Sequence, residues 1–184
     1  MKASFKDSLG IKIPSIVGLF GGLWVWVGAF SVVVLYQLLI TPFVSQAPTL
    51  IELEQQMKEL SPLHLFLLLA LTPGVCEELL FRGFALRPLE NKLGPKWAIL
   101  ITSLAFAMVH LDFIRLIPTF ILGLAFGFVS VKTRSIFPSI ILHTVNNSVA
   151  ILFPYDKFLT YGYMIPVFII SLLVVFIIFR NQPR

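Results

Sequence analysis

Charged residues are scarce in this chain. Only 12% of its 184 residues are Asp, Glu, Lys or Arg, whereas 58% are hydrophobic. A soluble domain usually carries about twice that charged fraction. The hydrophobic residues come in blocks close to the ~20 residues that cross the hydrocarbon core of a bilayer. The polar sequence that remains leaves no room for a second, soluble domain, so we predict a single integral membrane domain over residues 1–184.

Cysteine is nearly absent as well. The single cysteine, Cys76, excludes an internal disulfide. The chain also lacks an internal repeat and a low-complexity tract. Its net charge of +5 is compatible with a nucleic-acid partner. However, the basic residues lie in short segments between the hydrophobic blocks, as cytoplasmic loops require, so the expected partner is the lipid bilayer and not nucleic acid.

The hydrophobic blocks predict an all-α, polytopic membrane helix bundle. It has about six transmembrane helices, and spans two to five form its core. The predicted spans cover about residues 15–40, 62–86, 95–110, 116–131, 136–153 and 163–179. A short interfacial helix is predicted over residues 50–60, and a kink at Pro73, because proline removes a backbone hydrogen bond inside a helix.

The distribution of positive charge predicts the orientation of the bundle. With six spans, both termini lie on one side of the membrane. Eleven of the 14 Lys and Arg residues also fall on that side. Cytoplasmic loops carry such an excess, so we predict cytoplasmic N- and C-termini. The hydrophobic stretch of the first span is longer than a signal-peptide core, which favours an uncleaved anchor helix.

Ionisable residues interrupt the second span. Charged groups inside a bilayer are expensive and usually functional. Glu78 and Arg82 are four residues apart, so they share a helix face and can form an ion pair. Glu77 points about 100° away from Glu78, which leaves it free for another partner. We therefore predict one structural and one chemical glutamate.

Two further spans carry polar residues. His110 ends the third span, and His143 and Asn147 lie one helical turn apart on the fifth. If these groups meet Glu77 in one cavity, they can hydrolyse a peptide bond. Glu77 would be the general base, and His110 would hold the attacking water or shuttle its proton. His143 and Asn147 would donate hydrogen bonds to the oxyanion.

The polar residues form three patterns that, in this order on successive spans, resemble the motifs of the CPBP (Abi) family: Glu77-Glu78-x-x-x-Arg82, Phe106-x-x-x-His110 and His143-x-x-x-Asn147. That family contains type II CAAX prenyl endopeptidases and bacteriocin-processing or immunity-related membrane proteins. The resemblance covers about residues 62–153. It implies a glutamate-dependent intramembrane endopeptidase that forms no covalent intermediate. Its base would be Glu77, with Glu78 and Arg82 in support.

Other functions fit the same residues. Glu77, His110 and His143 could bind zinc in a metalloprotease, although we expect no metal or other cofactor. Cys76 with His110 and Asn147 supplies the residue types of a cysteine protease, but Cys76 points about 100° away from Glu77. A non-catalytic, bacteriocin-immunity-like membrane protein and a small proton-coupled transporter are further alternatives. The expected substrate of the peptidase is a membrane-anchored protein or peptide, cleaved in a CAAX-type reaction or in the processing of a leader or tail. The sequence leaves the oligomeric state open.

Overall fold

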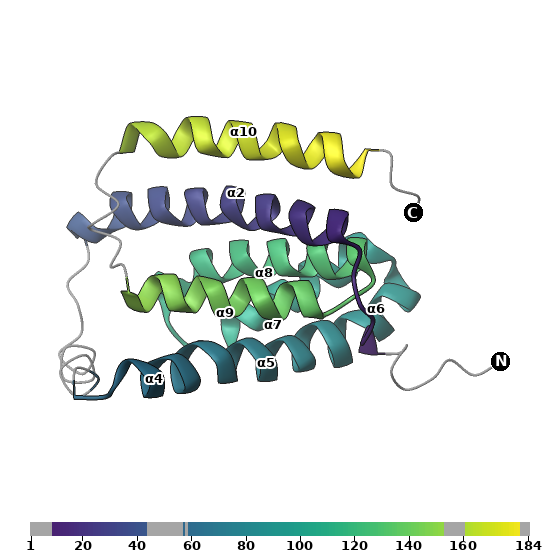
Figure 1. The fold of residues 1–184 in the computed structure, drawn as a ribbon, viewed down its shortest axis with the longest axis horizontal. Helices are drawn as coiled ribbons and strands as arrows, with labels where there is room; N and C mark the ends of the chain where they lie inside the picture. Colours follow the sequence, from purple (N-terminus) through teal and green to yellow (C-terminus); the bar gives the residue numbers. More distant parts are fainter. Residues whose placement is uncertain (1–8, 44–56, 58, 153–160, 181–184) are drawn as a thin grey trace.

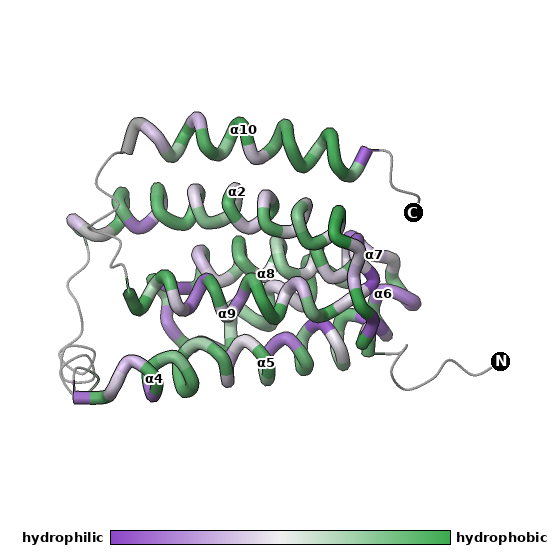
Figure 2. The backbone as a smooth tube through the Cα atoms, viewed as in Figure 1, coloured by the Kyte–Doolittle hydropathy of each residue, from purple (hydrophilic) through white to green (hydrophobic). Residues whose placement is uncertain are grey.

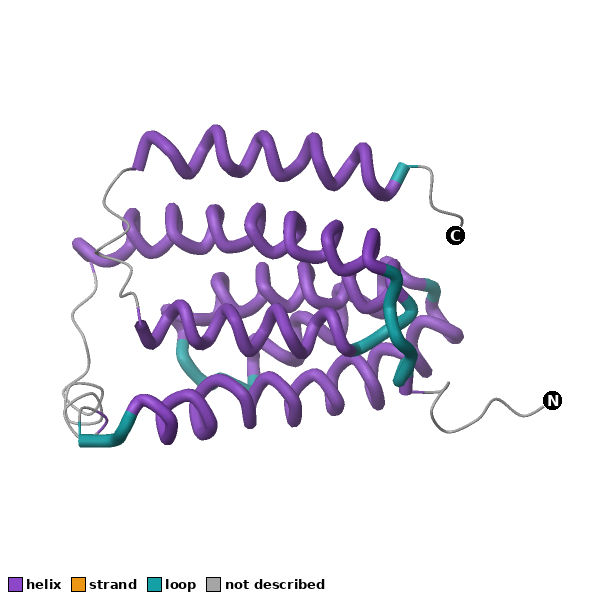
Figure 3. Tube along the Cα trace, in the orientation of Figure 1, coloured by secondary structure: helices purple, strands orange, loops and turns teal. Residues whose placement is uncertain are grey.

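The computed structural model describes residues 9–43, 57, 59–152 and 161–180. Every regular element in these ranges is a helix or helical turn (Figure 3). The elements are α2 (Ile16–Ile40), η1 (Thr41–Phe43), α4 (Pro62–Leu65), η2 (Phe66–Leu71), α5 (Thr72–Glu78), η3 (Leu79–Ala85), α6 (Leu86–Leu93), α7 (Pro95–Met108), α8 (Phe113–Thr133), α9 (Phe137–Leu152) and α10 (Tyr161–Phe179). The predicted interfacial helix over residues 50–60 lies largely outside the described residues.

The helices form a bundle in which α10 lies along α2 at one edge (Figure 1). On its other side α2 packs against α8 and α9, and α5 packs against α9. The shorter α7 packs against α8 and α6. The start of α2, the end of α10 and the α8–α9 turn lie at the same end of the bundle as α6 (Figure 1). The all-helical membrane bundle predicted from the sequence is confirmed.

Among the described residues, three helical segments are long and apolar enough to cross a membrane: Ile16–Ile40, Pro62–Leu93 and Phe113–Thr133. Three shorter apolar helices, Pro95–Met108, Phe137–Leu152 and Tyr163–Phe179, complete the bundle. At 1.5 Å per residue the 14 residues of α7 span about 21 Å, less than the ~30 Å of a hydrocarbon core. The long helices consist mostly of hydrophobic residues (Figure 2), and many of their large apolar side chains are exposed, which suits contact with lipid.

The second predicted span is longer than expected. Helical structure continues from Pro62 to Leu93, seven residues beyond the predicted end at Leu86. The extension is α6, whose charged residues resemble a loop in the sequence. In the structure they are paired, because Arg87 binds Glu90 and the backbone carbonyl of Ser130, while Glu90 also binds Arg134. These contacts tie α6 to the end of α8.

The long helix is not a regular α-helix. Two π-helical segments, η2 and η3, flank the α-helical segment that carries Glu77 and Glu78. Pro73 explains part of this irregularity. In an α-helix the carbonyl of Leu69 would accept a bond from the amide of residue 73, and proline has no N–H. The kink at Pro73 stays a prediction, and the irregularity beside it consists of π-helical turns, which often occur at functional sites.

The packed interior extends to the first helix. Its buried hydrophobic cluster joins α2, α8 and α9: Val33, Leu122, Phe126, Val129 and Leu142, with Val25, Trp26, Ala29 and Ile121 packed against them. Helix α2 therefore supports the fifth predicted span from the side opposite to the glutamates.

Gly74 sets the distance between the glutamate-bearing helix and α9. A Cβ at Gly74 would lie 3.1 Å from the backbone nitrogen of Thr144, next to His143. Replacing Gly74 with Ala is therefore expected to push α5 and α9 apart and to lower the free energy of unfolding by about 1–3 kcal/mol. Thermal unfolding in detergent would measure this change.

Gly83 provides the matched control on the same long helix. A Cβ there would meet its nearest atom, in Leu9, at 3.5 Å, which is ordinary contact. Gly83→Ala should leave stability unchanged or raise it, since Ala favours a helix by about 1 kcal/mol over Gly. Equal stability of the two variants would contradict the close approach at Gly74.

Candidate active site

A buried ion pair lies at the centre of the site. Nη1 of Arg82 donates a hydrogen bond of 2.8 Å to Oε1 of Glu78, and both side chains are fully buried. Nη2 of Arg82 donates to the carbonyl of Gly123 on α8 at 3.0 Å. The ion pair predicted from the four-residue spacing is confirmed. It fixes the long helix against α8 and holds Glu78 as a hydrogen-bond acceptor.

His143 lies between the two glutamates. Its Nδ1 is 2.9 Å from Oε1 of Glu78, and its Nε2 is 3.8 Å from Oε2 of Glu77. Since Oε1 of Glu78 also accepts a bond from Arg82, Nδ1 of His143 is the donor in this contact. Helix α9 is thereby joined to Glu78 through Nδ1, while Nε2 faces Glu77 across 3.8 Å.

Aromatic rings hold the histidine and the arginine in place. The His143 ring stacks on Phe126 with centroids 5.2 Å apart, and meets the edge of Phe106 at 5.7 Å. The guanidinium of Arg82 lies 4.6 Å from the centroid of Phe106 and 5.7 Å from that of Phe126. Cation–π contacts of this kind stabilise a desolvated charge. The two phenylalanines thus separate the charged cluster from the apolar bundle and fix its geometry.

The two glutamates differ in exposure. The Glu78 side chain is 0% exposed, whereas that of Glu77 is 31% exposed. The Oε2 atom of Glu77, which faces His143, has no hydrogen-bond partner in the described part of the chain. Glu77 therefore combines a partly exposed side chain with a buried oxygen that faces His143 and lacks a hydrogen-bond partner, and such an oxygen can accept a hydrogen bond from water.

His110 lies near this cluster and does not bind Glu77. Its Nδ1 is 2.8 Å from the carbonyl of Phe106, and its ring meets the edge of the Phe106 ring at 5.0 Å. No hydrogen bond or ion pair joins His110 to either glutamate within the described residues. Phe106 instead contacts His110 on one side and His143 on the other.

Asn147 lies one turn beyond His143 on α9. Its Nδ2 donates to the carbonyl of Leu69 at 3.2 Å. This is the carbonyl that Pro73 leaves without an α-helical partner. Asn147 therefore joins α9 to the long helix at a second point, four residues from the contact of His143 with the glutamates.

Several residues of this site were not identified from the sequence. Phe126 and the carbonyls of Gly123 and Leu69 belong to it. Phe126 is one of 18 phenylalanines, and backbone carbonyls give no sequence signal, so only the fold identifies them. Pro73 is a sequence signal that could have identified the Leu69 carbonyl as part of the site. In a regular α-helix this carbonyl would accept its hydrogen bond from the amide of residue 73, and proline has no N–H.

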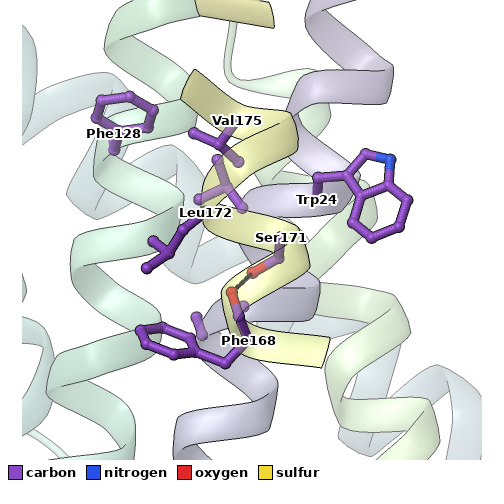
Figure 4. A pocket seen from close by; sticks show the side chains of 9 residues that line it. Trp24, Phe128, Phe168, Ser171, Leu172 and Val175 are labelled. Carbon is purple, nitrogen blue, oxygen red and sulfur yellow. Dashed lines mark hydrogen bonds between the residues drawn. The ribbon is translucent and has the colours of Figure 1, made fainter. Parts of the chain in front are cut away.

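The positions of these side chains also bear on the alternative metal and cysteine-protease sites. Within the described residues no group of three His, Cys, Asp or Glu side chains is arranged to hold a metal ion, and this range includes Glu77, His110 and His143. Cys76 is exposed, whereas Glu78, two residues later, is buried. An apolar cavity of about 160 Å³ lies elsewhere, between α2, α8 and α10, and its lining contains none of the predicted site residues (Figure 4).

The central part of the chain matches a known family. Residues 59–149 match the model of the Rce1-like family, which is described as type II CAAX prenyl endopeptidase Rce1-like. This range contains all six predicted site residues. Comparison with curated proteins gave no match, and neither did comparison with solved structures. The match confirms the predicted resemblance to the CPBP family over residues 59–149, and it supports an integral membrane protease that acts on membrane-associated proteins.

Proposed function

We propose that this protease hydrolyses a peptide bond near a prenylated C-terminal cysteine with a water molecule activated by Glu77. One observation carries the proposal. His143 binds Glu78 through Nδ1 and turns Nε2 towards Glu77, 3.8 Å from its Oε2. A gap of this length between two polar atoms is suited to a bridging water or substrate group. The family match favours this function over an immunity protein or a transporter.

The reaction needs no covalent enzyme intermediate. Glu77 takes a proton from water as the water oxygen bonds to the scissile carbonyl carbon. The carbonyl oxygen becomes an oxyanion, to which His143 and Asn147 donate hydrogen bonds. When the intermediate collapses, the C–N bond breaks and the proton held by Glu77 passes to the leaving nitrogen. His110 helps to bind the water, while Glu78 and Arg82 hold His143 in place.

The hydrogen bonding of His143 adds a condition to this mechanism. Because Nδ1 donates to Glu78, Nε2 can donate to the oxyanion only when the ring carries both protons. The oxyanion role proposed for His143 therefore requires its imidazolium form.

The proposal is tested with purified protein in detergent and a synthetic peptide that ends in a prenylated Cys-a-a-X sequence. Mass spectrometry should detect cleavage of this peptide and a much slower reaction of the unprenylated one. A chelator, and the substitution Cys76→Ala, should each change the rate less than about 2-fold. Loss of activity with the chelator and its recovery with zinc would instead favour the metalloprotease. An inactive Cys76→Ala variant would favour the cysteine protease.

We also propose that the end of the bundle with the α8–α9 turn faces the cytoplasm. Two contacts bring basic segments together at this end. The hydroxyl of Ser135 donates to the carbonyl of Lys12, and Arg134 pairs with Glu90 of α6. Clustered basic residues favour the cytoplasmic side. Cysteines introduced at Lys132, in a Cys76→Ala background, should react with an impermeant thiol reagent only from the cytoplasmic side.

A further inference from the structure

A chain of hydrogen bonds leads from α2 to the candidate active site. The indole Nε1 of Trp26 donates to Oδ1 of Asn146 at 3.2 Å. Nδ2 of Asn146 donates to Oδ1 of Asn147 at 3.4 Å, and Nδ2 of Asn147 donates to the carbonyl of Leu69 at 3.2 Å. The chain thus begins on a helix outside residues 59–149, passes through Asn147 of the third motif and ends on the long helix at Leu69.

The first two members of this chain are held firmly. Asn146 is only 5% exposed, so its polar atoms depend on partners inside the protein. Trp26 packs against the buried cluster of α2, α8 and α9, and its ring contacts Phe30 at 5.3 Å. This packing restricts the direction in which the indole N–H can point. The position of Asn146 is therefore determined by α2 as well as by its own helix.

The chain accounts for most of the bonding capacity of Asn147. A carboxamide has one oxygen and two N–H donors. The oxygen accepts from Asn146 and one N–H donates to Leu69, which fixes both the side-chain torsion and the identity of the nitrogen. The second N–H has no partner within the described residues. An amide anchored at two points directs its remaining donor in one direction.

We infer that Trp26 and Asn146 are positioning residues that aim the remaining N–H of Asn147 at the oxyanion. This inference rests on the proposed function and extends it to α2. Preorganised donors stabilise an oxyanion better than donors that must reorient during the reaction. A variant that breaks the chain should therefore lower kcat and leave KM nearly unchanged, since substrate binding does not involve these residues.

The test compares Trp26→Phe with Trp24→Phe in the full chain, using cleavage of the prenylated peptide. Both substitutions remove an indole from α2. Trp24 lines the apolar cavity, and its indole makes no hydrogen bond to another described residue (Figure 4). Trp26→Phe should lower kcat about 3- to 10-fold, the effect of one neutral hydrogen bond. Trp24→Phe should retain the kcat of the wild type. A wild-type kcat in Trp26→Phe would overturn the inference.

Two further variants separate positioning from a loss of stability. If Trp26→Phe does not fold, Asn146→Ala breaks the same chain at its middle and should lower kcat similarly. In an Asn147→Ala background, Trp26→Phe should cause no additional loss, because the group it positions is absent. An additional loss of 3-fold or more would show that Trp26 acts by another route and would overturn the inference.

The same series distinguishes this inference from the proposed function. An impaired Asn147→Ala variant beside a fully active Trp26→Phe variant contradicts only the positioning role. Full activity of Asn147→Ala would contradict the oxyanion role proposed for that residue, whatever the result at Trp26.

Discussion

Replacing Glu77 with Gln is expected to lower kcat for the prenylated peptide by about 10²- to 10⁴-fold, the usual contribution of a general base. Gln has nearly the same shape as Glu and cannot accept the proton of water. Since Glu77 makes no hydrogen bond through Oε2 and is partly exposed, its loss should change the unfolding temperature little. Peptide cleavage followed by mass spectrometry, and thermal unfolding of the same preparation, would measure both quantities.

The neighbouring glutamate provides the comparison for this result. Glu78→Gln removes a carboxylate that binds both Arg82 and His143, so it should reduce stability as well as activity. The combination of a stable, inactive Glu77→Gln variant and a destabilised Glu78→Gln variant would assign the chemical and the structural glutamate. A Glu77→Gln variant with more than a tenth of the wild-type kcat would contradict the role of Glu77 as the base.

Replacing Arg82 with Ala is expected to have the largest effect on stability. It would leave the carboxylate of Glu78 fully buried with His143 as its one remaining side-chain partner within the described residues. Removing one member of a buried ion pair usually costs about 3–5 kcal/mol. The cation–π contacts with Phe106 and Phe126 and the bond to the Gly123 carbonyl would be lost too. Unfolding in detergent would measure the change in free energy.

Removing both charges together tests the cause of that effect. Replacing Glu78 and Arg82 with Leu in one variant removes the buried carboxylate that has lost its guanidinium, so much of the stability lost in Arg82→Ala should return. Activity should stay low, because His143 would lose the acceptor that orients its ring. If Arg82→Ala is as stable as the wild type, the ion pair does not hold the long helix against α8.

The helices could be predicted from the sequence because lipid imposes long hydrophobic blocks. The bounds of α2 and α10 lie within two residues of those predicted. The extension through α6 could not be predicted, since its stability comes from tertiary contacts. In the sequence, the charges of Arg87 and Glu90 are typical of a loop. Only the fold shows that Arg87 binds Ser130 and that Glu90 binds Arg134.

The candidate site was only partly predictable for the same reason. The pairing of Glu78 with Arg82 follows from helix geometry alone. The contact of His143 with both glutamates does not, because adjacent residues on a helix point about 100° apart and the sequence suggests separate partners. An imidazole has nitrogens on two sides of its ring, which lets one residue of α9 face both carboxylates. Phe126 and Trp26 contribute through the packing of α8 and α2, which the motifs do not encode.

The most direct test of the central claim is an experimental structure with a prenylated peptide whose scissile bond is replaced by a phosphonate. The tetrahedral phosphonate imitates the intermediate that forms when water adds to the carbonyl. We predict that its oxygens lie within about 2.6–3.2 Å of the Glu77 carboxylate and of Nε2 of His143. A phosphonate bound elsewhere, for example in the apolar cavity between α2, α8 and α10, or a Glu77 side chain that faces lipid, would contradict the claim.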